Sequence, residues 1–295
     1  MMNKLAFGLA LAASTVVAAC RGDGGTAILA DNGAVGFVRF INAIPDSGGQ
    51  DWRFVDQVDG SPPAFNLGYR GVSPGASYQQ ASAGTRHLRV FQSAFDQSYG
   101  DPTQASPSIV STVFIDTAFT VAEGHHYSLI AVGSLKAKTA KLLILDDADF
   151  ADPGGSIAIR VVNLGVAPTV DVYASPTGGT AALPAALVTG LAQNAASNFI
   201  PMATGALTLR AEAGGVTTLP AMVDVAAPAG VAADKANNLT AIGGSTIAGS
   251  VFTAFLFPPA TAGTRGALVV AVTCPTKCAT PGAVFAVDRY PPSGF

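Results

Sequence analysis

The chain contains an internal repeat, which restricts its possible folds more than any other feature of the sequence. The stretch VRFINAIPDSGGQDWRF from residue 38 matches IRVVNLGVAPTVDVYA from residue 159. Arg39 and Arg160 are equivalent, so the copies are offset by 160 − 39 = 121 residues. At the same offset Tyr78 pairs with Phe199, and GTRHLRV from residue 84 pairs with GALTLRA from residue 205. The sequence therefore predicts two tandem domains of one fold.

The last part of each copy matches at a different offset. AVGS from residue 131 pairs with AIGG from residue 241, an offset of 241 − 131 = 110, and AKLLIL from residue 140 would then face FTAFLF from residue 252. On this alignment the first copy carries 121 − 110 = 11 extra residues, which we place in the loop QSYGDPTQASPS from residue 97.

Each copy consists of short apolar segments that are separated by Gly, Pro, Asn and Asp. This spacing, over about 110 to 120 residues, is typical of a two-sheet sandwich. We predict an all-β chain of two tandem immunoglobulin-like antiparallel β-sandwiches, at residues 36–150 and 151–262. Residues 263–295 are expected to form a C-terminal β-hairpin around a cysteine pair, which either completes a sheet edge or begins a truncated third unit.

Residues 1–19 have the parts of an export signal: a cationic start at Lys4, an apolar run, and Ala18 and Ala19 at its end. The run is shorter than the roughly 20 apolar residues that a membrane-spanning helix needs. VAAC, which ends at Cys20, resembles the lipobox of bacterial lipoproteins and implies cleavage before Cys20 and acylation of its thiol. Residues 20–35 would then be a lipidated flexible tether. Arg21 follows the cysteine, and the lack of Asp there resembles lipoproteins sorted to the outer membrane.

The composition limits the classes of partner and ligand that the protein is expected to bind. The net charge is −3, and −4 once Lys4 is removed with the signal, so the protein has no general attraction to nucleic acid. Cys274 and Cys278, in CPTKC, are predicted to form a disulfide in an exported protein. A metal site there would need two more ligands, and no Cys or His lies nearby in the sequence. We expect no cofactor and no metal.

Three short motifs suggest chemistry, and each has a simpler explanation. Gly71–Gly75 fits the G-x-S-x-G nucleophile elbow around Ser73, but the second copy reads AQNAA there and Pro74 favours a turn. His125-His126 suggests a metal ligand, yet the alignment places Asn237-Asn238 in that slot, which favours a solvated turn. The acidic cluster suggests calcium but lacks the EF-hand pattern, so an interdomain linker is the simpler interpretation; its members are Asp146, Asp147, Asp149 and Asp152.

One uncharged stretch, residues 239–257, is long enough to span a membrane. Its partner in the repeat carries Lys136, Lys138 and Lys141, and equivalent segments should share a structure. We therefore expect both to be β-hairpins, so that only the lipid contacts the bilayer.

The segments VRFINAIPD, VDVYA from residue 170 and YSLIAVGSL from residue 127 resemble the bacterial family called domain of unknown function 4397. The resemblance covers most of residues 36–260 and is weaker in the second copy, which lacks the Pro-Asp pair. It implies an extracytoplasmic, sandwich-like domain that is often found in tandem behind lipoprotein signals. It implies no catalytic residue.

We expect a non-enzymatic cell-envelope lipoprotein that displays two domains for binding or adhesion to an envelope protein or surface ligand. A structural component of an envelope complex is the alternative, and a hydrolase using Ser73 is a weaker one. Features confined to the first copy are free to serve binding; they are Trp52, Arg53, Tyr69, Tyr78, Arg86 and His87, although Trp52 and Tyr78 also suit a core. The candidate binding loop contains Phe95, Tyr99, Asp101 and Gln104.

Overall fold

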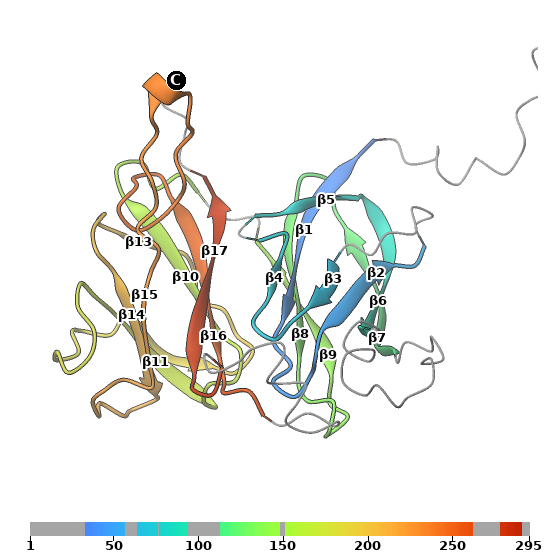
Figure 1. Cartoon of the computed structure of the whole chain (residues 1–295), viewed down its shortest axis with the longest axis horizontal. Coiled ribbons are helices and arrows are strands. Elements are labelled where there is room, and N and C mark those ends of the chain that lie inside the picture. Colours follow the sequence, from blue (N-terminus) through green and yellow to red (C-terminus); the bar gives the residue numbers. More distant parts are fainter. Residues whose placement is uncertain are drawn as a thin grey trace, which may run out of the picture.

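A computed structural model describes residues 33–56, 64–75, 77–93, 113–147, 151–261 and 278–290. These residues form two lobes that lie side by side (Figure 1). Each lobe contains two β-sheets, an inner one that faces the other lobe and an outer one. The predicted all-β architecture of two sandwiches is confirmed.

The first sandwich extends from β1 to β9. Its inner sheet has the order β4 (Val72–Ser73), β1 (Val35–Asn42), β8 (His126–Val132) and β9 (Lys141–Asp146), and β5 (Gln79–Ser82) also pairs with β1. Its outer sheet has the order β3 (Ala64–Leu67), β2 (Gln50–Phe54), β6 (Gly84–Gln92) and β7 (Val113–Val121). Between the sheets lie Phe40, Trp52, Leu88 and Leu129, all fully buried.

The second sandwich repeats this plan. Its inner sheet has the order β13 (Ile200–Met202), β10 (Ile157–Asn163), β16 (Val251–Phe257) and β17 (Gly282–Arg289). Its outer sheet has the order β12 (Val188–Ala192), β11 (Thr169–Ser175), β14 (Thr208–Ala213) and β15 (Val223–Ala226). The core between them contains Val161, Val172, Leu209 and Phe252.

The central strands of each inner sheet are parallel, and here the expectation of antiparallel sheets does not hold. β1 runs parallel to β8, and β10 runs parallel to β16. These strands are buried on both faces, because their outward side chains pack across the interface between the lobes. Burial on both faces removes the alternation of apolar and polar residues, so the sequence carries little sign of strand direction.

The strand pairing corrects the alignment of the last part of the repeat. Arg39 faces Ser128 across β1 and β8, and Arg160 faces Thr253 across β10 and β16. β8 therefore corresponds to β16 at an offset of 253 − 128 = 125, and β9 corresponds to β17. The pairing of AKLLIL with FTAFLF is wrong, because the second copy has extra chain, residues 228–250, ahead of β16. β17 is an edge strand in the inner sheet of the second sandwich. The first arm of the expected C-terminal hairpin lies outside the described residues.

The two inner sheets pack against each other through a third apolar core. It contains Ile41 and Ile130 from the first sandwich, and Val162, Phe255 and Phe257 from the second. Apolar burial of this kind is the main favourable term in holding two protein surfaces together. The chain is thus four sheets deep, with a core in each lobe and a third between them.

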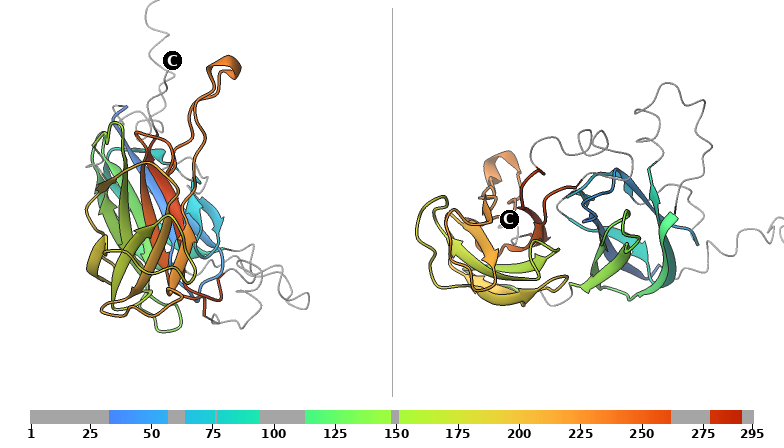
Figure 2. Two further views of the ribbon diagram at one scale, coloured as in Figure 1. Left: turned by 90° about the vertical axis from the view of Figure 1, so that its left-hand side faces the viewer. Right: turned by 90° about the horizontal axis from the view of Figure 1, so that it is seen from below.

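A narrow hairpin projects from the second sandwich between β15 and β16 (Figure 2). Its arms are joined at Val231 and Ile242 and at Asp234 and Leu239, and the 3-10 helix η1 (Lys235–Asn237) forms the tip. The expectation that residues 239–257 form a β-hairpin is wrong, since they contain one arm of this projection and then β16. Within the ranges that the structure describes, no helix is long and apolar enough to cross a membrane.

Candidate functional site

Two buried arginines lie in the middle of the inner sheets. Arg39 is on β1 and Arg160 is on β10, each inside an otherwise apolar strand and almost completely buried. A buried guanidinium destabilises a fold unless it is paired with a carboxylate and hydrogen-bonded. The partners come from the strand ends, because Asp147 follows β9 and Asp288 lies near the end of β17.

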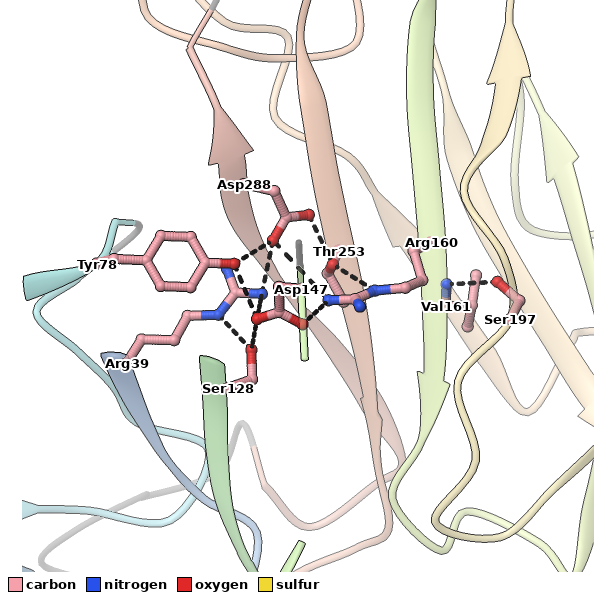
Figure 3. A network of polar contacts seen from close by, with 9 residues as sticks. All are labelled: Arg39, Tyr78, Ser128, Asp147, Arg160, Val161, Ser197, Thr253 and Asp288. Carbon is pink, nitrogen blue, oxygen red and sulfur yellow. Dashed lines mark hydrogen bonds and ion pairs between the residues drawn. The ribbon is translucent and has the colours of Figure 1, made fainter. Parts of the chain in front are cut away.

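Each arginine binds the carboxylate of the other sandwich (Figure 3). Arg39 Nη2 donates to Asp288 Oδ1 at 2.6 Å, and Arg160 Nη2 donates to Asp147 Oδ1 at 2.5 Å. Both carboxylates have no exposed side-chain surface. The two charge pairs therefore cross the interface in opposite directions, and two positive and two negative charges meet there.

Two hydroxyl groups close these pairs into a ring, which we call the charge ring. Arg39 Nε donates to Ser128 Oγ at 2.7 Å, and Ser128 Oγ donates to Asp147 Oδ2 at 2.5 Å. In the second sandwich Arg160 Nε donates to Thr253 Oγ1 at 3.1 Å, and Thr253 Oγ1 donates to Asp288 Oδ2 at 2.7 Å. The charge ring contains Arg39, Ser128, Asp147, Arg160, Thr253 and Asp288. It is two-fold symmetric in its chemistry, since each copy supplies an arginine, a hydroxyl and an aspartate.

Aromatic rings cover the charge ring. The guanidinium of Arg39 lies 4.5 Å from the ring of Tyr78, and that of Arg160 lies 4.6 Å from the ring of Phe199, its partner in the repeat. The Tyr78 hydroxyl lies 2.9 Å from Asp147 Oδ2 and 2.8 Å from Asp288 Oδ1. Tyr78, which was a candidate binding residue or core residue, is therefore part of the interface.

The electrostatics favour a fixed structure over proton transfer. Burial, and then the nearby carboxylate of Asp288, raise the pKa of Tyr78 far above its ordinary value, so its hydroxyl stays protonated. Burial would lower the pKa of Arg39, but the carboxylates of Asp288 and Asp147 outweigh it and raise this pKa. Fully buried, mutually neutralised groups of this kind bind the two sandwiches together and present nothing to a substrate.

The segment NAIPD organises one end of the first sandwich. Asn42 Oδ1 accepts from the Ile44 amide at 3.1 Å and from Gln50 Nε2 at 2.7 Å. Asp46 accepts from the Leu135 amide at 2.9 Å, which fixes the turn between β8 and β9. Asn163, the repeat partner of Asn42, accepts from the amides of the loop after β10 in the same way. These residues hold loops in place, so the motif behind the family resemblance is structural.

Several residues that the sequence analysis singled out fall outside the part of the chain that the structure describes. Cys20 and the loop residues Phe95, Tyr99, Asp101 and Gln104 are outside the described residues. Cys278 is described and buried, but Cys274 is outside the described residues. Their disulfide therefore stays a prediction.

The other first-copy residues are divided between the interior and the surface. Trp52 is fully buried in the first core, as the simpler interpretation held, and the Tyr69 hydroxyl donates to Pro258 O at 2.6 Å in the interface. Arg86 Nε donates to Ser82 O at 2.8 Å, which links β6 of the outer sheet to the end of β5 in the inner sheet. Arg53 and His87 remain on the surface of the outer sheet.

The catalytic motif at Ser73 lacks its required context. Ser73 is on the two-residue strand β4, and a turn follows it where a nucleophile elbow needs a helix.

The histidine pair also has a structural explanation. His126 begins β8 and stacks on Phe37, with ring centres 4.5 Å apart, while His125 Nδ1 lies 2.9 Å from Asp146 Oδ2. The repeat partner of His126 is Val251 at the start of β16, so the alignment with Asn237-Asn238 is wrong. Burial lowers the pKa of His126.

The acidic cluster is dispersed. Asp147 lies in the connection between the sandwiches, as the linker interpretation held, but it is completely buried in the charge ring. Asp152 binds Arg289 Nη2 at 2.9 Å and the Gly154 amide at 2.8 Å, and Asp149 lies outside the described residues. Among the residues that the structure describes, no group of three His, Cys, Asp or Glu side chains is placed to hold a metal ion.

One exposed surface combines aromatic and charged side chains, and we call it the outer face. It is the solvent side of β2, β3, β6 and β7, where Arg53 pairs with Arg89 and Arg89 pairs with Asp116. Arg89 Nε donates to Asp116 Oδ2 at 2.9 Å. The hydrogen bonds from His87 and then from Arg89 hold the pKa of Asp116 below its usual value.

Two aromatic side chains, Phe65 and Phe91, belong to the same sheet as these charges. Phe91 pairs with Val113 at the ends of β6 and β7, and the guanidinium of Arg53 lies 5.6 Å from the ring of Phe91. Phe65 on β3 is 59% exposed. The sequence carries one signal for the outer face. Alternate residues of a strand lie on the same side, so residues 85, 87, 89 and 91 of β6 share one face.

Comparisons with known proteins give a family match and remote structural likenesses. No curated protein matches the chain. A crystal structure of CBMbc, family CBM26, from Eubacterium rectale Amy13K in complex with maltoheptaose, shows 9% identity. The likeness covers 79% of this chain and 99% of that one with a TM-score of 0.19, which is too low to support an argument. The family model described as domain of unknown function, DUF4397, matches residues 36–173.

That range contains the first sandwich together with β10 and β11 of the second. The predicted resemblance to the DUF4397 family is thereby confirmed over residues 36–173.

Proposed function

We propose that the protein is a non-enzymatic cell-envelope lipoprotein, held at a membrane through Cys20, that binds a surface ligand through the first sandwich. The observation that carries this proposal is the outer face, where Arg53, Arg89 and Asp116 lie beside Phe91 at the surface. Aromatic and arginine side chains provide much of the binding energy at recognition surfaces. Outer-membrane attachment is part of the proposal and follows from Arg21.

The charge ring supports a binding role over a catalytic one. It uses the buried side chains of Arg39, Asp147, Arg160 and Asp288 to join the sandwiches, and their charges are neutralised within the ring. The result is a rigid support for the outer face, and rigid elements position a binding surface more accurately than loops do.

The candidate binding loop follows the outer face closely in the sequence. Residues 95–104 belong to the connection between β6 and β7, and Phe91 and Val113 form the last pair of those strands before the connection. We therefore propose that the loop and the outer face act on the same ligand.

Photo-cross-linking in intact cells tests the binding surface and captures whichever ligand contacts it. Phe91→p-benzoylphenylalanine should give a cross-linked adduct, whereas the same replacement of Ile144, which is 40% exposed on β9, should not. Adding Arg89→Ala, or deleting residues 95–104, should abolish the adduct while circular dichroism shows a folded protein. Equal adducts from both positions would favour the structural alternative, and none from position 91 would overturn the proposal.

Cell fractionation tests the anchor separately. Cys20→Ser should leave an uncleaved precursor or release the protein from the membrane fraction, since acyl chains provide the proposed attachment. Membrane retention of a correctly cleaved Cys20→Ser protein would show that the anchor is wrong.

A further inference from the structure

The hairpin that projects from the second sandwich exposes large apolar side chains. Val231, Leu239 and Ile242 are 56%, 57% and 54% exposed, and almost every residue from 231 to 240 is exposed. Single exposed apolar residues are common on soluble proteins. Several on one narrow projection indicate a surface that contacts another protein or a membrane.

The projection has a defined structure. The Val231 amide donates to Ile242 O at 3.0 Å and the Ile242 amide donates back to Val231 O at 2.9 Å. Asp234 and Leu239 exchange a second such pair, both at 2.9 Å. At the base, a Cβ on Gly230 would come within 2.6 Å of Ile242 O, so the arms approach closely only because glycine is present.

The hairpin lies at the same end of the molecule as the start of β1 (Figure 1). It leads into β16, and the Gly249 amide donates to Ser156 O at 2.8 Å, which places the start of β16 beside the start of β10. β1 starts at Val35, so residues 21–34 connect this end of the fold to Cys20. The start of β1, through which the fold is connected to the proposed lipid, and the apolar hairpin therefore lie at one end of the described structure.

The lengths are compatible with contact between the hairpin and the bilayer. From Cys20 to Val35 the chain spans at most about 50 Å when fully extended, and an arm of the hairpin from Gly230 to the tip spans at most about 25 Å. A lipid at Cys20 can thus hold the tip of the hairpin at the membrane surface without strain in the connection.

We propose that this hairpin lies along the interfacial layer of the bilayer that Cys20 anchors and contacts its acyl boundary through Val231, Leu239 and Ile242, an inference that rests on the lipid anchor of the proposed function. Lys235 at the tip suits anionic headgroups. The Asp234 carboxylate is already bound by the amides of Ala236 and Asn237 at 3.0 and 3.2 Å. A shallow position suits this mixture, since apolar side chains enter the acyl boundary while polar groups stay among the headgroups.

Tryptophan fluorescence of the intact lipidated protein in phosphatidylcholine vesicles tests this contact with the bilayer. The chain has a single tryptophan, Trp52, which is fully buried and provides a constant background. Leu239→Trp and Val231→Trp each place a second tryptophan on the hairpin. The matched control is Val216→Trp, because Val216 is 37% exposed and follows Gly214, whose amide binds Thr169 O at the opposite end of the second sandwich.

The added emission from Leu239→Trp and Val231→Trp should shift to shorter wavelength on vesicle binding and be quenched by lipids brominated near the headgroup end of the acyl chain. The emission from Val216→Trp should change in neither way. Vesicle flotation in the same samples reports the anchor. Flotation without a shift at position 239 or 231 would overturn the hairpin proposal alone, and loss of flotation would overturn the anchor and the hairpin proposal with it.

Discussion

Removing one charge from the charge ring should destabilise the whole protein. Asp288→Asn preserves the size of the side chain but removes the negative charge that Arg39 Nη2 binds at 2.6 Å. Asp288 also accepts hydrogen bonds from the hydroxyls of Tyr78 and Thr253, and its side chain has no exposed surface. The variant therefore leaves the buried ring with a net positive charge.

The size of the effect follows from these contacts. The bonds from Arg39 and Tyr78, each contributing about 1.5 to 3 kcal/mol to a carboxylate, become bonds to a neutral amide oxygen that contribute about 1 kcal/mol. The bond that Thr253 donates is lost, because the amide nitrogen is not an acceptor. Removing one partner of a buried ion pair generally costs about 3 to 5 kcal/mol. We expect Asp288→Asn to lower the free energy of unfolding by about this amount, and Asp147→Asn to do the same because it has the equivalent place in the ring.

Urea denaturation followed by two signals provides the assay. Trp52 fluorescence reports the first sandwich, and far-ultraviolet circular dichroism reports both. The two transitions should coincide in the wild-type protein and separate in Asp288→Asn, since the variant weakens the contact between the sandwiches. Asp116→Asn is the matched control, because Asp116 is exposed and binds Arg89 within one sheet.

A double substitution makes the test strict. Arg39→Met combined with Asp288→Asn removes one charge of each sign, so the pair should cost clearly less than the sum of the single variants. Additive losses, or a loss from Asp288→Asn no larger than that from Asp116→Asn, would refute the argument that the charge ring holds the sandwiches together.

Three further predictions concern other parts of the chain. Burial raises the pKa of Tyr69 to about 12, so its protonated hydroxyl stabilises the fold fully below pH 10, and the free energy of unfolding should fall by about 3 kcal/mol between pH 10 and 12. Tyr69→Phe should lose less over this range in urea titrations, and an equal loss would show that Tyr69 does not cause the decrease. Asn42→Ala should cost about 2 to 3 kcal/mol in thermal denaturation, because the Leu67 carbonyl and the Ile44 amide lose their buried partner, and a loss under 0.5 kcal/mol, roughly that of a surface substitution, would refute this. Cys274 and Cys278 should resist alkylation under non-reducing denaturation, and labelling of both thiols would exclude their disulfide.

The sequence was most informative where the two copies keep the same spacing. The offset of 121 residues correctly paired Arg39 with Arg160 and Tyr78 with Phe199, and each arginine contacts the aromatic residue of its own copy at the interface. The arginines also carried a signal that the repeat alone did not use. A charged residue inside an apolar strand requires a buried counter-charge, and here those counter-charges are Asp147 and Asp288.

The remaining ring members could not be found from the pattern. Asp147 lies among acidic and turn residues that are typical of a linker, and Asp288 lies in the segment expected to form a separate hairpin. The extra chain ahead of β16 shifted the alignment, so Ser128 and Thr253 were not recognised as equivalent. The outer face was only partly predicted: Arg53 and His87 were named for their residue type, while Arg89 and Asp116 become visible as a group only when β6 and β7 pair.

The crossed charge pairs have a consequence for how a domain of this design must be used. Each arginine has its shortest contact with the aspartate of the other copy, although Arg39 also lies 3.5 Å from Asp147 of its own copy. A single copy standing alone would lose the closer partner of its arginine. The same ring can form between two identical chains, because each copy supplies one arginine, one hydroxyl and one aspartate. The tandem chain in this sense resembles a homodimer whose subunits have been joined end to end, and a one-copy relative with the same residues should gain stability by pairing.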